Sequence, residues 1–228
     1  MEVEEITQKL KALSNPEAVR GMARFGINPY NTYGISIPNL KKLAKEIGKD
    51  HKLALKLWET GIHEARILAG FIDDHKQVTE EQMEEWVSGF DSWDICDQVL
   101  SYLFDKTPYA YPKAYQWSQR DEEFVKRAGF VLMACLAVHD KKAPDEKLEA
   151  FLPVIKREAL DERNYVKKAV NWALRQIGKR NLYLNDKAVK VTEEIREIDS
   201  KSARWIAADA LRELTSEAAH NRLKEKGA

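Results

Sequence analysis

Apolar residues recur along most of the chain at steps of three and four, the spacing that places side chains on one side of an α-helix. In the middle of the chain, Ile95, Cys96, Val99, Leu100 and Leu103 follow this spacing. The strict alternation of apolar and polar residues that is typical of half-buried strands is missing. The pattern therefore predicts an all-α protein of about a dozen helices joined by short turns.

Prolines and small polar residues mark where these helices begin and end. Ile37-Pro38, Thr107-Pro108 and Ala143-Pro144 suit helix starts or turns. Ser36 is expected to cap a helix that runs to residue 47. Further helices are expected over residues 62–71 and 162–179, and the last long helix covers residues 201–214.

The helices also repeat a theme, in which one charged residue precedes a run of small apolar residues. Arg66, Asp97, Arg127, Lys168 and Arg204 occupy this place, at intervals of 31, 30, 41 and 36 residues. The longest interval contains a polar turn at residues 140–145. Such degenerate periodicity in a helical chain predicts stacked helix pairs, an α-α superhelix whose equivalent second helices line one concave surface.

Composition limits the cellular compartment and the cofactors that we expect, but it does not exclude binding to nucleic acid. The 228 residues include 37 Lys and Arg and 37 Asp and Glu, so the formal net charge is zero, and only the placement of charge can reveal a binding face. Two cysteines without a C-x-x-C motif and five scattered histidines predict buried free thiols, no metal and no cofactor. With no signal core and no long apolar run, we expect a soluble, intracellular, cytoplasmic protein that is a monomer.

Trp93 and Asp97 are the candidates for chemistry. They lie four residues apart, so they fall one turn apart on the edge of the central apolar stripe. A carboxylate beside an indole at the edge of a groove suits chemistry on a cation. The alternative is structural: Asp91 caps the helix, Trp93 belongs to the core, and Asp97 is solvated.

Two helices near the C-terminus carry cations and tryptophans on the side opposite their apolar stripe, which suits a phosphate backbone and its sugars. In the first, Trp172 lies among three cations. The alternative is a solvated basic face whose tryptophans pack against a neighbouring helix pair. The residues predicted to bind DNA are Lys126, Lys168, Arg175, Lys179, Lys201, Arg204, Trp205 and Arg212.

Arg127 stands at the entrance of a helix that is apolar on almost every side, from residue 128 to residue 138. A charge in such a place is costly unless it is paired or binds an anion. One interpretation is a salt bridge to Glu122 or Glu123. The other is a clamp for a phosphate group.

Taken together, these segments resemble the AlkD family of DNA glycosylases, which are built from HEAT-like repeats. The likeness extends from about residue 22 to the helix at 203–214. Its segments are Met22-Ala23-Arg24-Phe25, Gly34-Ile35-Ser36-Ile37-Pro38, Leu57-Trp58, Ser92-Trp93-Asp94-Ile95-Cys96-Asp97, Lys126-Arg127-Ala128 and Lys168-Ala169-Val170-Asn171-Trp172-Ala173-Leu174-Arg175.

The resemblance implies a curved right-handed solenoid of HEAT-like repeats that forms a single domain over residues 1–228, with a concave DNA-binding groove. It also implies metal-independent removal of cationic N3- and N7-alkylated purines from double-stranded DNA. Asp97 would be the catalytic carboxylate, Trp93 and Trp172 the aromatic contacts to the lesion, and Arg127 a phosphate contact. A member of this family carries two adjacent tryptophans where this chain has Ser92-Trp93.

Two other classes of function fit the same pattern. One is a non-catalytic repeat protein that binds DNA or RNA, in which Asp97 has only a structural role. The other is a scaffold whose groove binds a protein helix, a common use of helical solenoids. Steep salt dependence would distinguish nucleic-acid binding from a protein-binding groove.

Overall fold

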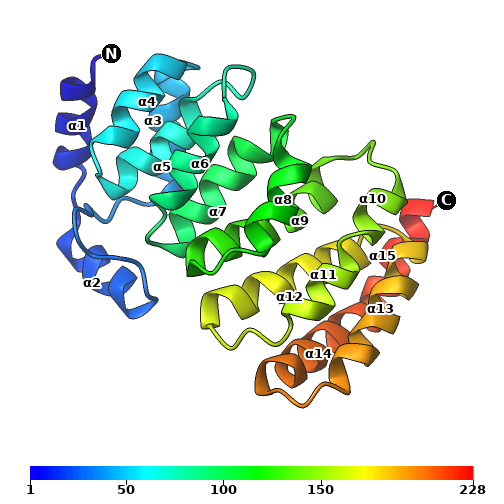
Figure 1. Ribbon diagram of the computed structural model, residues 1–228. Helices are drawn as coiled ribbons and strands as arrows, with labels where there is room; N and C mark the ends of the chain where they lie inside the picture. The colour runs from blue at the N-terminus through cyan, green and yellow to red at the C-terminus, as the bar shows by residue number, and fades with distance from the viewer. Residues whose placement is uncertain (228) are drawn as a thin grey trace. The chain divides into compact units, whose positions relative to one another are not determined.

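The computed structural model describes residues 1–227, and within that range the chain is helical, with no strand (Figure 1). It divides into two compact units, residues 1–108 and residues 109–228. No helix in the described range is long and apolar enough to cross a membrane. The all-α prediction is confirmed.

The first unit contains seven α-helices and one short 3₁₀ helix among its described residues. Helix α5 packs against α3, α4 and α7 and is buried on nearly all sides. The elements of this unit are α1 (Val3–Ala12), α2 (Pro16–Arg24), α3 (Ile37–Ile47), α4 (His51–Glu59), α5 (His63–Ile72), α6 (Glu80–Ser88), α7 (Trp93–Tyr102) and the 3₁₀ helix (Phe104–Lys106).

The second unit is built from helices that follow one another through short turns. Helix α12 packs against α9 on one side and against α13 and α14 on the other (Figure 1). The elements are α8 (Ala110–Ser118), α9 (Glu123–His139), α10 (Asp145–Glu149), α11 (Leu152–Glu158), α12 (Asn164–Gly178), α13 (Leu182–Arg196), α14 (Lys201–Leu214) and α15 (Glu217–Gly227).

The repeat register predicted from sequence is present in the helices. Asp97, Arg127 and Lys168 are each the fifth residue of their helix, in α7, α9 and α12 respectively. Arg66 and Arg204 are the fourth residues of α5 and α14. The polar segment at 140–145 runs from the end of α9 to the first residue of the short helix α10, which explains the longer interval at this point.

Helix α9 is the most deeply buried element of the second unit, with every residue from 125 to 137 buried. Gly129 allows α8 to approach it closely. A Cβ at this position would lie 2.4 Å from the backbone nitrogen of Ser118 and 3.0 Å from the carbonyl oxygen of Ala114. A side chain there would force two backbones apart, so only glycine fits without a shift of α8 against α9.

Helix boundaries differ from the sequence prediction in detail. The helix expected over 162–179 covers Asn164–Gly178, a difference that is common at frayed ends. Ser36 does precede α3, but its hydroxyl makes no capping hydrogen bond. Ser92, not Asp91, occupies the N-cap position of α7, so the capping role expected for Asp91 is wrong.

Candidate functional site

Helix α7 positions the two residues singled out for chemistry in the first unit. Trp93 is its first residue and Asp97 follows one turn later. Both side chains are half-buried, whereas Ile95 and Cys96 between them are buried in the core. The Trp93 indole nitrogen donates a hydrogen bond to the carbonyl oxygen of Phe25 at 3.1 Å. Trp93 and Asp97 therefore lie at the edge of the apolar stripe, and the indole is held in one orientation.

The segment before α3 is fastened to the start of α7. The backbone N–H of Asn28 donates to the Ser92 hydroxyl at 2.9 Å, and the Asn28 side-chain amide donates to the Asp91 carboxylate at 2.6 Å. Ser92 is completely buried. The position before Trp93 is therefore occupied by a small, buried residue that anchors a loop. A larger side chain at this position would displace the loop.

A buried histidine and two buried carboxylates lie at the starts of α5 and α7. His63 is 3 % exposed, and its Nε2 lies 2.8 Å from the Asp94 carboxylate. The neighbouring Glu64 is fully buried, and its carboxylate accepts hydrogen bonds from the backbone N–H groups of Tyr33, Gly34 and Ile35 at 2.7 to 3.2 Å. These contacts join the starts of α5 and α7 to the loop that precedes α3. Sequence reasoning missed them, because the partners are about thirty residues apart.

The His63–Asp94 pair should make folding stability depend on pH. Burial by itself lowers the pKa of His63, but the hydrogen bond and charge of Asp94, together with Glu64 and Asp91, raise it overall. A raised folded-state pKa contributes stability below the unfolded-state value of about 6.5, and this contribution is lost as pH rises through the folded-state pKa.

We therefore expect the unfolding free energy, measured by urea denaturation between about pH 5.5 and 9, to fall with rising pH through this contribution. His63→Gln keeps a hydrogen-bond donor for Asp94 but cannot titrate. Its stability should change less with pH than that of the wild-type protein. Equal pH profiles for the two proteins would contradict the assignment.

In the second unit, α9 and α12 carry the other two predicted site residues. Arg127 is only 5 % exposed, and its guanidinium donates a hydrogen bond to the carbonyl oxygen of Tyr165 at 2.8 Å. Trp172 lies on the same helix as Tyr165 and is half-buried. Because α9 and α12 pack against each other, Arg127 and Trp172 belong to adjacent helices.

Glu122, one of the two ion-pair partners considered for Arg127, is engaged elsewhere. It forms an ion pair with Arg120. The hydrogen bond from the Arg120 guanidinium is the main cause that lowers the pKa of Glu122 to about 2. On the side of α12, the carbonyl of Tyr165 accepts a hydrogen bond from the buried guanidinium.

Most of the cations predicted to bind DNA have acidic partners. On α14, Glu213 accepts from Arg175 at 2.5 Å and from Lys179 at 2.6 Å, and Asp209 pairs with Arg212. Burial alone would raise the pKa of Glu213, but Lys179 and Arg175 hold it below its usual range, so this carboxylate stays charged at neutral pH. The basic side predicted for α12 is therefore largely neutralised by α14.

Two more predicted cations are paired in the same way. Lys126 is 9 % exposed and lies 2.8 Å from Glu158. Arg204 is exposed and lies 2.8 Å from Asp199. The buried pair of Lys126 is structural in character, because breaking it would leave an uncompensated charge in the interior.

Three of the predicted DNA-binding residues are exposed: Lys168, Lys201 and Trp205. In the described part of the chain, neither of the two lysines forms an ion pair with a carboxylate. The ammonium group of Lys167, which sequence reasoning did not select, lies 5.1 Å from the centre of the Trp205 ring. Lys167 and Lys168 are adjacent on α12, so they point to different sides of the helix. An aromatic ring with a cation over its face is a suitable contact for a nucleic-acid backbone.

The chemistry available to these groups is that of carboxylates, indoles and cations. Within residues 1–225, whose side chains are described, no group of three His, Cys, Asp or Glu residues is arranged to hold a metal ion. Cys96 and Cys135 are buried and form no disulfide. A half-buried carboxylate such as Asp97 can stabilise positive charge that develops on a substrate.

Comparison with known proteins identifies relatives over nearly the whole chain. The family model described as DNA alkylation repair enzyme matches residues 6–214. Two curated relatives, the uncharacterized proteins Lin0241 of Listeria innocua serovar 6a and Lmo0209 of Listeria monocytogenes serovar 1/2a, are each 24 % identical over 199 residues. Each alignment covers 86 % of this chain and 87 % of the relative.

A solved structure shares the fold. It belongs to a new family of proteins related to the HEAT-like repeat DNA glycosylases with affinity for branched DNA structures. The TM-score is 0.80 at 22 % identity, and the match covers 98 % of this chain and 96 % of the other. The predicted HEAT-like repeat fold is thereby confirmed.

Proposed function

Because the chain belongs to the DNA alkylation repair enzyme family, we propose that it is a DNA glycosylase acting on alkylated purines. The reaction is hydrolysis of the N-glycosidic bond of cationic N3- or N7-alkylpurines in double-stranded DNA. The observation that carries this proposal is the pair Trp93 and Asp97, one turn apart at the start of α7 and inside the matched region. Both side chains are half-buried rather than part of the core.

In the proposed reaction the lesion supplies much of the driving force. An N7- or N3-alkylpurine is cationic, so it leaves as a neutral base and takes the electron pair of the glycosidic bond. The deoxyribose that remains develops oxocarbenium character, and the Asp97 carboxylate stabilises it electrostatically. Water adds to the anomeric carbon and loses a proton, with Asp97 orienting it. A neutral base leaves poorly, so a site without a strong general acid selects charged lesions.

The remaining site residues have binding roles in this proposal. The faces of Trp93 and Trp172 attract the cationic base or the sugar, each contributing about 0.5–2 kcal/mol. Arg127 contacts a phosphate group, with the Tyr165 carbonyl fixing one side of its guanidinium. No step uses a metal or a cofactor. We further propose that the protein acts as a cytoplasmic monomer, and a single repeat domain with a concave groove remains a prediction.

The direct test is to incubate the protein with methylated duplex DNA and to assay the solution for free methylpurines. Release of 7-methylguanine or 3-methyladenine is the expected result. A heat-denatured sample of the protein measures the spontaneous loss of these bases. Release no faster than in that sample would contradict the glycosylase proposal.

A second candidate is non-catalytic binding of branched DNA, the property of the structural relative with the same fold. It is supported by the fold that the two proteins share over 98 % of this chain. The pairing of Arg175, Lys179 and Arg212 with acidic residues of α14 leaves fewer cations for contact with DNA of either kind. Under this alternative the protein binds a four-way junction more tightly than a duplex of equal length and releases no alkylpurine. Measuring both properties on one preparation distinguishes the two functions.

The free cation Lys168 provides a quantitative test of the proposed DNA contact. Lys168→Ala should reduce the slope of log affinity against log salt for duplex DNA by about 0.9 if one phosphate contact is lost. Arg175→Ala should have a smaller effect, because Glu213 already holds that guanidinium. Lys190→Ala, which removes an exposed lysine of α13, is the charge-matched control. An equal slope for Lys168→Ala and the control would mean that Lys168 does not touch DNA.

A further inference from the structure

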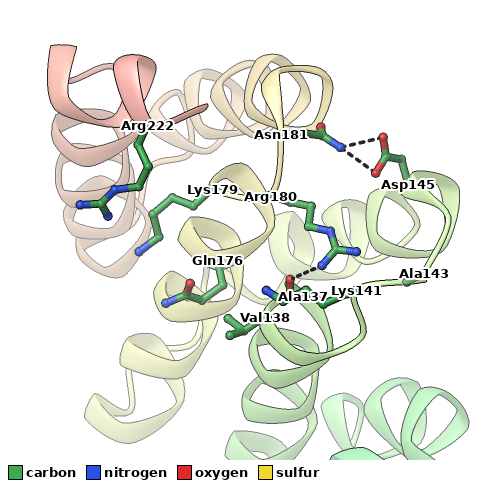
Figure 2. A pocket seen from close by; sticks show the side chains of 10 residues that line it. All are labelled: Ala137, Val138, Lys141, Ala143, Asp145, Gln176, Lys179, Arg180, Asn181 and Arg222. Carbon is green, nitrogen blue, oxygen red and sulfur yellow. Dashed lines mark hydrogen bonds between the residues drawn. The ribbon is translucent and has the colours of Figure 1, made fainter. Parts of the chain in front are cut away.

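The second unit contains a pocket whose lining includes none of the four proposed glycosylase residues Trp93, Asp97, Arg127 and Trp172, although it includes the predicted DNA contact Lys179. It has a volume of about 690 Å³ and lies where α9 and α12 end, beside the start of α13 (Figure 2). Ala137 and Val138 of its wall are ten and eleven residues after Arg127 on α9. Ten residues of helix span about 15 Å. The pocket is therefore at the opposite end of α9 from the predicted phosphate contact.

Cations predominate in the lining of this pocket. Lys141, Lys179, Arg180 and Arg222 line it, against one carboxylate, that of Asp145. They come from separate parts of the chain, the turn after α9, the end of α12 and helix α15. Like charges gathered around one cavity repel each other, so their convergence favours an anion inside it.

The single acid of the lining is already satisfied. The side-chain amide of Asn181 donates to both carboxylate oxygens of Asp145 at 2.9 Å, while its own oxygen accepts from the backbone N–H of Leu184 at 2.8 Å. In Figure 2 this pair closes one side of the pocket. Asp145 and Asn181 thus form one wall of the pocket. Because the Asp145 carboxylate is bound by Asn181, it does not pair with the cations of the lining.

Arg180 is fixed by the end of α9. Its guanidinium donates to the carbonyl oxygen of Asp140 at 2.8 Å and to that of Ala137 at 3.3 Å. These carbonyls belong to the last turn of a helix, where unpaired acceptors attract cations. The guanidinium has five N–H groups, so the two bonds orient Arg180 and leave further donors. Its charge stays within the pocket.

Three donors of the lining have no side-chain partner within the described part of the chain: Lys141, Gln176 and Arg222. Figure 2 shows that Gln176, Lys179 and Arg222 extend toward the same side of the pocket. The ammonium group of Lys179 lies 2.6 Å from the carboxylate of Glu213. Two free cations and one free amide therefore converge beside two cations that are held in place by the protein.

From this arrangement we propose that the pocket binds a phosphate group. Phosphate offers several acceptor oxygens and a negative charge, which matches ammonium, guanidinium and amide donors that approach from different directions. The volume is within the range of small-molecule sites, and Ala137, Val138 and Ala143 form an apolar wall beside the cations. The phosphate belongs either to a free nucleotide or to the backbone of bound DNA.

The test compares two double variants with equal loss of charge. Lys141→Gln with Arg222→Gln removes the two free cations of the pocket. Lys142→Gln with Lys224→Gln removes two exposed lysines that lie close to them in the chain but do not line the pocket. None of these residues belongs to the proposed glycosylase site, so both double variants should release methylpurines as the wild-type protein does.

Binding is measured by calorimetry at low salt with three probes: inorganic phosphate, a nucleoside monophosphate and a short DNA duplex. We expect the pocket double variant to bind at least one probe about ten times more weakly than the control double variant. Weaker binding of phosphate and the monophosphate identifies a free ligand, and weaker binding of the duplex alone identifies the DNA backbone. Equal affinities of the two double variants for all three probes, or no binding by the wild-type protein, would overturn the proposal. Neither result depends on glycosylase activity.

Discussion

Asp97→Asn is expected to reduce the release of 7-methylguanine from duplex DNA by about 10²–10³-fold, or roughly 3–4 kcal/mol of barrier, while duplex affinity stays equal or improves. Asparagine has nearly the size of aspartate and can still form hydrogen bonds. It carries no charge, so it cannot offset positive charge on the deoxyribose. A carboxylate near phosphates repels them in the ground state, so its loss does not weaken binding.

Excision and affinity can be compared directly in this variant, because Asp97 is half-buried and removing its charge should leave the core around α7 intact. Single-turnover excision and duplex binding are measured on the same preparation, and the unfolding curve is compared with that of the wild-type protein. Asp186→Asn, an exposed carboxylate on α13, controls for the change in net charge. Near-full activity of Asp97→Asn would show that another residue stabilises the transition state.

Gly129→Ala is expected to destabilise the second unit by about 3 kcal/mol or more, since overpacking that moves backbone is among the costlier substitutions. The added methyl group would lie 2.4 Å from the nitrogen and 2.9 Å from the Cα of Ser118. These are backbone atoms of α8, so no flexible side chain can move aside. The two helices must separate along a contact that is otherwise buried.

Gly21→Ala is the matched control, because a Cβ at that position in α2 would meet nothing within 4 Å. Alanine favours a helix over glycine by up to about 1 kcal/mol, so this variant should be as stable as the wild-type protein or slightly more so. Urea denaturation of both variants, followed by circular dichroism, measures the difference. Equal stability of the two would contradict the close approach of α8 to α9.

Much of the fold follows from local pattern. The three-and-four spacing of apolar residues requires only that one side of each helix be buried, so it predicted α7, α9, α12 and α14 within a few residues. The equivalent places of Asp97, Arg127 and Lys168 followed from the repeat interval alone. Trp93 and Asp97 were expected at the edge of a stripe, and both are half-buried.

Whether the charged side chains are paired or exposed to solvent could not be predicted in this way. Arg175 and Lys179 are on the polar side of α12, as expected, but that side meets the acidic residues Asp209 and Glu213 of α14. The one available signal was the interval: Glu213 follows Arg175 by 38 residues, close to the repeat spacing. A helix pattern indicates which side is polar, but not whether its charges face solvent or a neighbouring helix.

The sequence by itself determined the helices, their repeat register and the residue types available for chemistry, because each depends on side chains within one or two turns. Tertiary structure alone decided which polar groups meet. It brought His63 to Asp94, used Ser92 to anchor the loop at Asn28, and gathered Lys141 and Arg222 around one pocket. Such contacts depend on distances of a few ångströms between segments far apart in the chain, and helical periodicity carries no information about them.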